Sequence, residues 1–220
     1  LLQPGQDGYA VIGEIYGDFR LTDQVHANLG RKAYDTPYIN RNDVRMSPNT
    51  FEAYSITGLH GGQDGAAEWR WGVGYFDKIK ERNSDEFVSM SEDAGADVDR
   101  GVYAFGGNYK KGDFSLGAVN YYSDDIINIF YTEARYAVPL SEKTRLQFAA
   151  QYTDQQSTGD DLLNGSDFSA DQYGLKGELG WGPALFSVAW TSTGNETATQ
   201  SPWSGYPGYT SVQVEDFNRA

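Results

Sequence analysis

The 220-residue chain contains no cysteine, which excludes disulfide bonds, thiolate metal sites and cysteine nucleophiles. It has only two histidines, His26 and His60, too few for a histidine-rich metal site, so neither a metal nor another cofactor is expected. Basic residues are outnumbered, with 17 Lys and Arg against 31 Asp and Glu and a net charge of −14. Nucleic acid is therefore not expected as a partner, because phosphate binding needs clustered basic side chains. A run of about 20 apolar residues is also absent, so no transmembrane helix is predicted.

Glycine and aromatic residues are abundant: the chain has 26 Gly, 16 Tyr, 11 Phe and 5 Trp. This composition is typical of β-sheet with many tight turns, and it is too rich in aromatic residues for a disordered chain. Polar and apolar residues alternate with a period of two. In the segment 173–181, Leu175 and Trp181 fall on one face of a strand while Lys176 and Glu178 fall on the other.

Eleven such alternating runs are present, most of them 10 to 12 residues long. A tilted strand needs about 9–11 residues to cross a bilayer, about twice the length of an average globular strand. The length therefore favours an antiparallel transmembrane β-barrel, an all-β fold. The predicted strands are Tyr9–Phe19, Gln24–Ala33, Thr50–Leu59, Ala67–Lys78, Gly101–Lys110, Phe114–Tyr122, Asn128–Val138, Thr144–Thr153, Gln172–Trp181, Ala184–Thr193 and Thr210–Arg219.

The connections between these runs alternate in length. Short turns alternate with long polar loops at 34–49, 79–100, 154–171 and 194–209, and the short connection 123–127 breaks the pattern. Outer-membrane barrels have this arrangement, with tight turns at one end and long loops at the other. Aromatic residues gather near both ends of the runs, as expected for belts at the two membrane interfaces. Because eleven strands is an odd number and the last run lacks a terminal aromatic, we expect residues 1–220 to be one partial barrel.

A stretch near the front of the chain carries a more specific signal. Thr36-Pro37, then Asp43-x-Arg45-Met46-x-Pro48, then Thr50-Phe51-Glu52 follow one another in a fixed order and spacing. This stretch resembles the third-loop region of the OprD family of substrate-specific outer-membrane porins. The resemblance implies a monomeric eighteen-stranded barrel in the bacterial outer membrane, of which this chain would supply about eleven strands. It also implies a third loop, here 34–49, that folds inward and narrows the pore.

The family resemblance implies passive, selective diffusion of small anionic or zwitterionic solutes that carry carboxylates, with no catalysis. Outer-membrane lipid would surround the barrel. In the inferred constriction loop, Arg41 and Arg45 are candidates for an arginine pair at the narrowest point, with Asp35 and Asp43 tuning its field. A guanidinium is always charged and presents a fork of donors that fits a carboxylate. The alternative that stays open is that Arg45 binds Asp43 or Glu52 and pins the loop to the wall.

Five basic residues in the strands are candidates for a basic lumen wall. Most alternate with apolar neighbours, and a cation at the lipid midplane would cost about 2–4 kcal/mol, so we expect them to point into the lumen. They could act together as a chain of weak anion sites. Alternatively, each could simply pair with an acid such as Glu68, Glu133, Glu142 or Glu178. The five residues are Arg31, Arg70, Arg135, Arg145 and Lys176.

Two other protein classes share parts of this pattern. A soluble or cell-surface β-sandwich that binds carbohydrate also alternates polar and apolar residues, but its core is rich in branched aliphatic side chains. A barrel enzyme needs a Ser–His pair, and only His26 with Ser55 offers one. The acidic stretch 84–99 lacks a calcium-loop pattern and favours a hydrated outer loop. The aromatic loop 194–209 is either a sugar platform or a folded loop that packs its rings on the barrel mouth.

Overall fold

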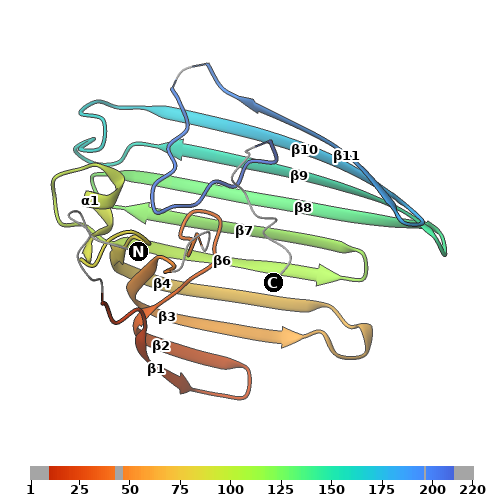
Figure 1. Ribbon diagram of the computed structural model, residues 1–220, viewed down its shortest axis with the longest axis horizontal. Helices are drawn as coiled ribbons and strands as arrows, with labels where there is room; N and C mark the ends of the chain where they lie inside the picture. The colour runs from red at the N-terminus through yellow and green to blue at the C-terminus, as the bar shows by residue number, and fades with distance from the viewer. Residues whose placement is uncertain (1–9, 43–46, 196, 211–220) are drawn as a thin grey trace.

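A computed structural model describes residues 10–42, 47–195 and 197–210. They form an antiparallel sheet in the order β1-β2-β3-β4-β6-β7-β8-β9-β10-β11, and the short β5 pairs with β4 (Figure 1). The order begins at β1 and ends at β11, and these two strands do not pair within the described residues, so the sheet is not closed. The strands are β1 (Ile15–Arg20), β2 (Val25–Lys32), β3 (Thr50–Gly61), β4 (Glu68–Lys80), β5 (Val88–Ser89), β6 (Val102–Lys111), β7 (Phe114–Ser123), β8 (Ile127–Ser141), β9 (Thr144–Gln156), β10 (Ser169–Trp181) and β11 (Ala184–Thr193).

The first ten predicted strands are confirmed, although β1 begins only at Ile15. Of the eleventh, all but Thr210 lies outside the described residues. Three short elements were not predicted. The 3-10 helix η1 (Gln63–Gly65) lies between β3 and β4, and β5 and the helix α1 (Met90–Ala94) lie inside the loop expected at 79–100. No helix among the described residues is long and apolar enough to cross a membrane.

Short turns gather at one end of the sheet and long connections at the other (Figure 1). The turns after β6 and β10 are only two residues long, and each begins with a glycine in the left-handed region, Gly112 at φ 55° and Gly182 at φ 54°. Glycine adopts this conformation without the steric cost that a side chain imposes. We call the two ends the turn end and the loop end.

The two faces of the sheet differ sharply. One, the open face, presents large apolar side chains to the exterior, among them Leu175 at 54% and Val188 at 76% exposure. The other, the covered face, carries polar side chains toward the turn end and packs against long connections at the loop end. Within the described residues no second sheet covers the open face, so the β-sandwich alternative is wrong. Such a broad apolar surface is suited to lipid, because a soluble monomer rarely exposes one this large.

Aromatic belts border the open face as the sequence predicts. A row of tyrosines runs across four neighbouring strands near the loop end, because Tyr54 pairs with Tyr75, Tyr75 with Tyr103 and Tyr103 with Tyr122. Near the turn end, the rings of Trp69 and Tyr109 lie 4.4 Å apart. Amphipathic rings in these two rows are suited to membrane–water interfaces. We call the tyrosine row the loop-side belt.

Tyr34, just after β2 at the loop end, does not join the loop-side belt. Its ring packs edge-on against Phe76 at 4.9 Å, against the hydrophobic core. The main core sits at the loop end, where long connections fold onto the covered face. Its fully buried members include Ile39, Phe51 and Ile129. This core positions the loops that are described next.

Candidate functional site

The connection that follows β2 folds back on itself as a narrow hairpin. The backbone N–H of Thr36 donates to the Ile39 carbonyl at 2.8 Å, and that of Arg41 donates to the Tyr34 carbonyl at 2.8 Å. Pro37 follows Thr36 at the tip, where its fixed φ suits a turn. The Thr36 hydroxyl also donates to the Ile39 carbonyl at 2.9 Å. Residues 34–42 are therefore a structured segment, which we call the inner loop.

Two strand residues hold the inner loop against the covered face. The fully buried Tyr121 hydroxyl in β7 donates to Thr36 Oγ1 at 2.8 Å and accepts the Tyr38 N–H at 3.3 Å. Gln155 in β9 donates through Nε2 to the Tyr38 hydroxyl at 3.2 Å. Burial raises the pKa of Tyr38 to about 12, so its hydroxyl stays neutral at physiological pH. Sequence analysis did not single out these residues, because in an alternating strand they look like ordinary inward-facing positions.

The connection after β11 packs on the inner loop. Its residues 197–209, which we call the outer latch, approach the inner loop through a bridge between Ser204 and Ile39. The Gln155 side chain makes two hydrogen bonds with the Gln200 backbone. Its Oε1 accepts the Gln200 N–H at 2.7 Å, and its Nε2 donates to the Gln200 carbonyl at 2.7 Å. Trp203 is 1% exposed and donates through Nε1 to the Met90 carbonyl at 2.8 Å. The latch is therefore a folded loop that buries its main ring, and not a sugar platform.

Arg41 lies at the base of the inner loop and forms a forked ion pair with Asp35. Its Nε is 2.9 Å from one carboxylate oxygen of Asp35, and a terminal nitrogen is 2.6 Å from the other. Both side chains remain part-exposed, 43% for Arg41 and 38% for Asp35. The structure therefore brings these two predicted residues together. The other two, Asp43 and Arg45, lie outside the described residues.

Four of the five predicted wall cations lie on the covered face, each beside a carboxylate. Arg70 is 2.9 Å from Glu68, Arg145 is 2.8 Å from Asp113, and Lys176 is 3.0 Å from Glu178. Arg135 bonds Glu133. Three of the four acids proposed as partners, Glu68, Glu133 and Glu178, thus form these ion pairs. The fourth, Glu142, does not pair with Arg145, which binds Asp113. Arg135 and Lys176 also share a row, because both pair in register with Ala149 of the strand between them.

Comparison with known proteins identifies the family to which this chain belongs. A model of the outer-membrane porin OprD family matches residues 6–220, nearly the whole chain. The chain belongs to the OprD family of outer-membrane porins. No curated protein matches this chain.

Solved structures with the same fold are also porins of this family. OpdK of Pseudomonas aeruginosa has a TM-score of 0.74 and 16% identity over 86% of this chain and 50% of its own. A second structure of OpdK, with vanillate, has a TM-score of 0.72 and 17% identity over 92% of this chain and 52% of its own. OccK2 (OpdF) of the same species, in complex with glucuronate, has a TM-score of 0.69 and 18% identity over 81% of this chain and 47% of its own. This OprD-family chain thus spans about half the length of the structures it matches.

The prediction for Arg31 is wrong in this OprD-family chain. Arg31 pairs in register with Ile15 and Glu52, which lie on the open face, and its Nε is 3.0 Å from Glu52. Arg31 and Lys32 are consecutive, so they must point to opposite faces, and Arg31 follows Leu29 by two residues, so the alternation places Arg31 on the apolar side. Lys32 takes the covered face, where Nζ donates to Asn28 at 3.0 Å. Arg31 can lie on the open face because it is at the loop end of the strand. Near the membrane interface, a charged side chain on the lipid-facing side destabilises a barrel by only about 0–1 kcal/mol.

His26 lies on the covered face of the sheet. Its Nδ1 lies 3.0 Å from Asp18 on the covered face. Ser55 instead has its hydroxyl 3.0 Å from that of Tyr34, so the Ser–His pair that a barrel enzyme would need is not formed. In the described part of the porin, no three His, Asp or Glu side chains are grouped so as to hold a metal ion.

Proposed function

We propose that this chain forms part of the wall and the narrowing of a channel for passive diffusion of small carboxylate-bearing solutes. The observation that carries the proposal is the inner loop, which lies across the covered face and is tied to it by Tyr121 and Gln155. A narrowing must hold its shape in water, and buried hydrogen bonds to the wall supply that rigidity. Diffusion through such a narrowing needs no nucleophile or general base, only a constriction and charges of suitable sign.

The ion pairs on the covered face favour anions over cations. In all four the cation is more exposed than its acid, and the difference is largest in two: Arg70 is 60% exposed against 25% for Glu68, and Arg145 is 58% against 42% for Asp113. A solute carboxylate therefore reaches the guanidinium more readily than a cation reaches the partner acid. An exposed guanidinium keeps donors available while its partner occupies the others. Arg70 and Arg145 are accordingly our preferred wall sites.

Arg135 and Lys176 are better shielded and act differently. Their side chains are 14% and 21% exposed, and Glu133 and Glu178 beside them are similarly covered. Neighbouring strands lie about 5 Å apart, so the two cations flank Ala149 at a separation of about 10 Å between backbones. We propose that they shape the local potential, while the more exposed arginines exchange contacts with solute.

Two related porins support the choice of solute. The OpdK structure with vanillate and the OccK2 structure with glucuronate each carry a ligand with a carboxylate group. Our proposal extends that ligand chemistry to this chain, on the basis of the shared family and the arginines described above.

The test is a reversal-potential measurement on the full-length porin in planar bilayers under a salt gradient. Arg41→Glu reverses the charge at the base of the inner loop, so the potential should shift toward cation selectivity, with a smaller shift for Arg41→Gln. Lys111→Glu makes the same charge change on the open face, where Lys111 pairs with Phe114, and should leave the potential unchanged. Equal shifts in the Arg41 and Lys111 variants, or no shift in either, would contradict the proposed path.

A further inference from the structure

A lysine on the covered face is not among the wall cations that the sequence predicts. Lys110 lies near the end of β6, just before the two-residue turn to β7 (Figure 1). It pairs in register with Glu68 of β4 and Ser115 of β7, which both lie on the covered face. Its side chain therefore points toward the lumen, at the turn end of the sheet.

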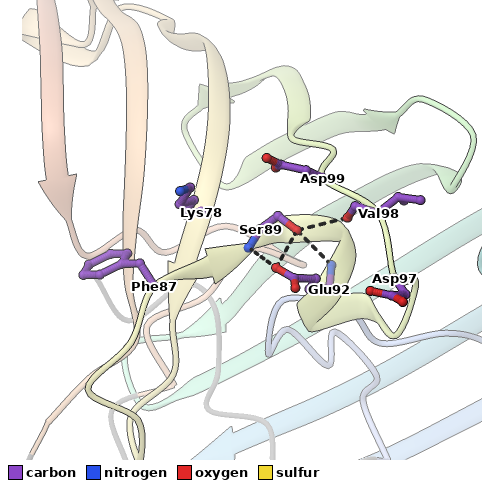
Figure 2. Close-up of a pocket in the computed structure, with 7 residues that line it drawn as sticks. All are labelled: Lys78, Phe87, Ser89, Glu92, Asp97, Val98 and Asp99. Carbon is purple, nitrogen blue, oxygen red and sulfur yellow. Dashed lines mark hydrogen bonds between the residues drawn. The ribbon is translucent and has the colours of Figure 1, made fainter.

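Two other lysines provide a contrast. Lys111 pairs with Phe114 on the open face. Lys78 lines a cavity of about 260 Å³ beside β5 and α1, as Figure 2 shows, and it lies opposite Glu52 on the open face. Both side chains are outside the solute path proposed above, so the loss of either charge is a suitable comparison for the loss of Lys110.

The ammonium group of Lys110 is available to a solute. The residue is exposed, and within residues 10–42, 47–195 and 197–210 its side chain has neither an ion pair nor a hydrogen bond. An ammonium has three N–H donors and no acceptor, so it binds anions and not cations. The four predicted wall cations on the covered face differ from Lys110, because each of them already bonds an acid.

The acid directly opposite Lys110 is turned away from it. Glu68 pairs with Lys110 in register, but its carboxylate is 2.9 Å from Arg70. A Cβ atom on Gly62 would lie 2.8 Å from the other carboxylate oxygen of Glu68. Gly62 belongs to the connection between β3 and β4, so this oxygen faces the side of β4 that is away from β6.

Two further acids near this end of the sheet also bond arginines. The carboxylate of Asp113, in the turn after β6, is 2.8 Å from Arg145 of β9 and is therefore directed away from β6. Glu133 of β8 bonds Arg135 on its own strand. Each of these carboxylates thus has an arginine partner, and the ammonium of Lys110 keeps its full charge.

The net charge of this part of the covered face follows from the pairings. Three ion pairs lie around Lys110, so the four cations and three acids sum to 4 − 3 = +1. The field of an ion pair falls quickly with distance, whereas an unpaired charge acts over the Debye length, about 10 Å at 0.1 M salt. Lys110 therefore sets the sign of the potential that a solute meets before it touches the wall.

We propose that Lys110 gives the turn end of this wall its preference for anions and binds the solute carboxylate together with Ser115. The proposal rests on the diffusion function proposed above. Ser115 is next to Lys110 in the same row, and its hydroxyl offers a neutral donor to the second carboxylate oxygen. The inner loop lies at the loop end, so a solute that moves toward the turn end reaches Lys110 after the narrowing.

The test is the reversal potential of the full-length porin in planar bilayers under a KCl gradient, at an ionic strength of about 0.1 M. Lys110→Gln should lower the permeability of Cl⁻ relative to K⁺ about threefold, because a unit charge about 7 Å away in water changes the local anion concentration by about that factor. Lys110→Glu should lower the ratio about ninefold, since it changes the charge by two units. Lys110→Arg keeps the charge and should keep the wild-type ratio.

Control variants on the open face remove the same charge from the other side of the wall. Lys111→Gln, at the adjacent residue, and Lys78→Gln should both keep the wild-type ratio. Thermal unfolding of each variant verifies that it is folded. An unchanged ratio in Lys110→Gln and Lys110→Glu, or an equal shift in Lys111→Gln, would overturn the proposal.

Uptake of a matched pair of solutes tests the contact with a carboxylate. Glucuronate differs from glucose by a carboxylate in place of a hydroxymethyl group, and swelling of porin-containing liposomes measures the entry of each. Lys110→Gln should slow glucuronate about threefold and leave glucose unchanged. Ser115→Ala should slow glucuronate less, because a neutral donor binds a carboxylate more weakly than a charged one. If Lys110→Gln slows both solutes equally, it acts on the size of the pore and the proposal is wrong.

Two outcomes separate this inference from the proposed function. If Arg41→Glu shifts the reversal potential and Lys110→Gln does not, the channel function stands and the role of Lys110 is wrong. If the wild-type porin prefers neither Cl⁻ over K⁺ nor glucuronate over glucose, the proposed function is wrong, and the role of Lys110 is wrong with it.

Discussion

Removing one hydroxyl group should loosen the inner loop without disturbing the barrel. Tyr121→Phe deletes the oxygen that accepts the Tyr38 N–H at 3.3 Å and donates to Thr36 Oγ1 at 2.8 Å. Thr36 keeps its bonds to Ile39, so the main loss is the buried Tyr38 N–H, which is left without its acceptor. Leaving a buried donor unsatisfied costs about 1–3 kcal/mol. A value of about 2 kcal/mol raises the equilibrium constant for loop opening about 30-fold.

Amide hydrogen exchange on the full-length porin measures this opening. Protection of the Thr36 and Arg41 amides, which close the inner-loop hairpin, should fall about 30-fold in Tyr121→Phe. Exchange in the middle of β9 should not change. The control is Tyr122→Phe, the next residue, because its hydroxyl donates to the exposed Asp124 on the open face. If the two variants change loop protection equally, or if neither changes it, the loop is not held by Tyr121.

Further predictions address the helix α1 and the two faces of the sheet. Burial, with a contribution from the charge of Glu81, raises the pKa of Asp93 to about 6. The ionised carboxylate is therefore unfavourable in the folded chain, and this loss of stability grows as pH rises from about 4 to about 6. Asp93→Asn should therefore raise the free energy of unfolding by about 1–2 kcal/mol at pH 7.5 and change it little at pH 4; thermal melts that shift equally at both pH values would contradict this. Val188→Arg, which places a cation on the open face between the belts, should cost about 2–4 kcal/mol in folding into bilayers, and Ser187→Arg on the covered face should fold normally. Comparable losses in both variants would show that the face assignment is reversed.

Much of the sheet could be predicted from local pattern. The alternation around Leu175 and Lys176 correctly places one on the open face and the other on the covered face, because successive side chains of a strand point to opposite sides. The same rule places Arg31 with Leu29 on the open face, so the expectation that Arg31 points into the lumen departed from the alternation. Glu52 across from Arg31 stabilises this outcome.

The motif predicts a loop after β2 that folds inward, but it does not predict how that loop is attached. Tyr121 and Gln155 are far from residues 34–42 in the chain, and nothing in their own strands distinguishes them from other inward-facing positions. The outer latch meets the inner loop at Ser204 and Ile39, which are similarly distant. The short strand β5 and the helix α1 escaped prediction because the segment is polar and its elements are only a few residues long.

The amino-acid sequence alone determines that this chain forms long antiparallel strands with one apolar side, because strand alternation and turn chemistry depend only on neighbouring residues. Tertiary structure decides which loops pack on the covered face and which carboxylate each cation meets. Those contacts join residues far apart in the chain, and they exist only once the curvature and register of the sheet have brought distant strands together.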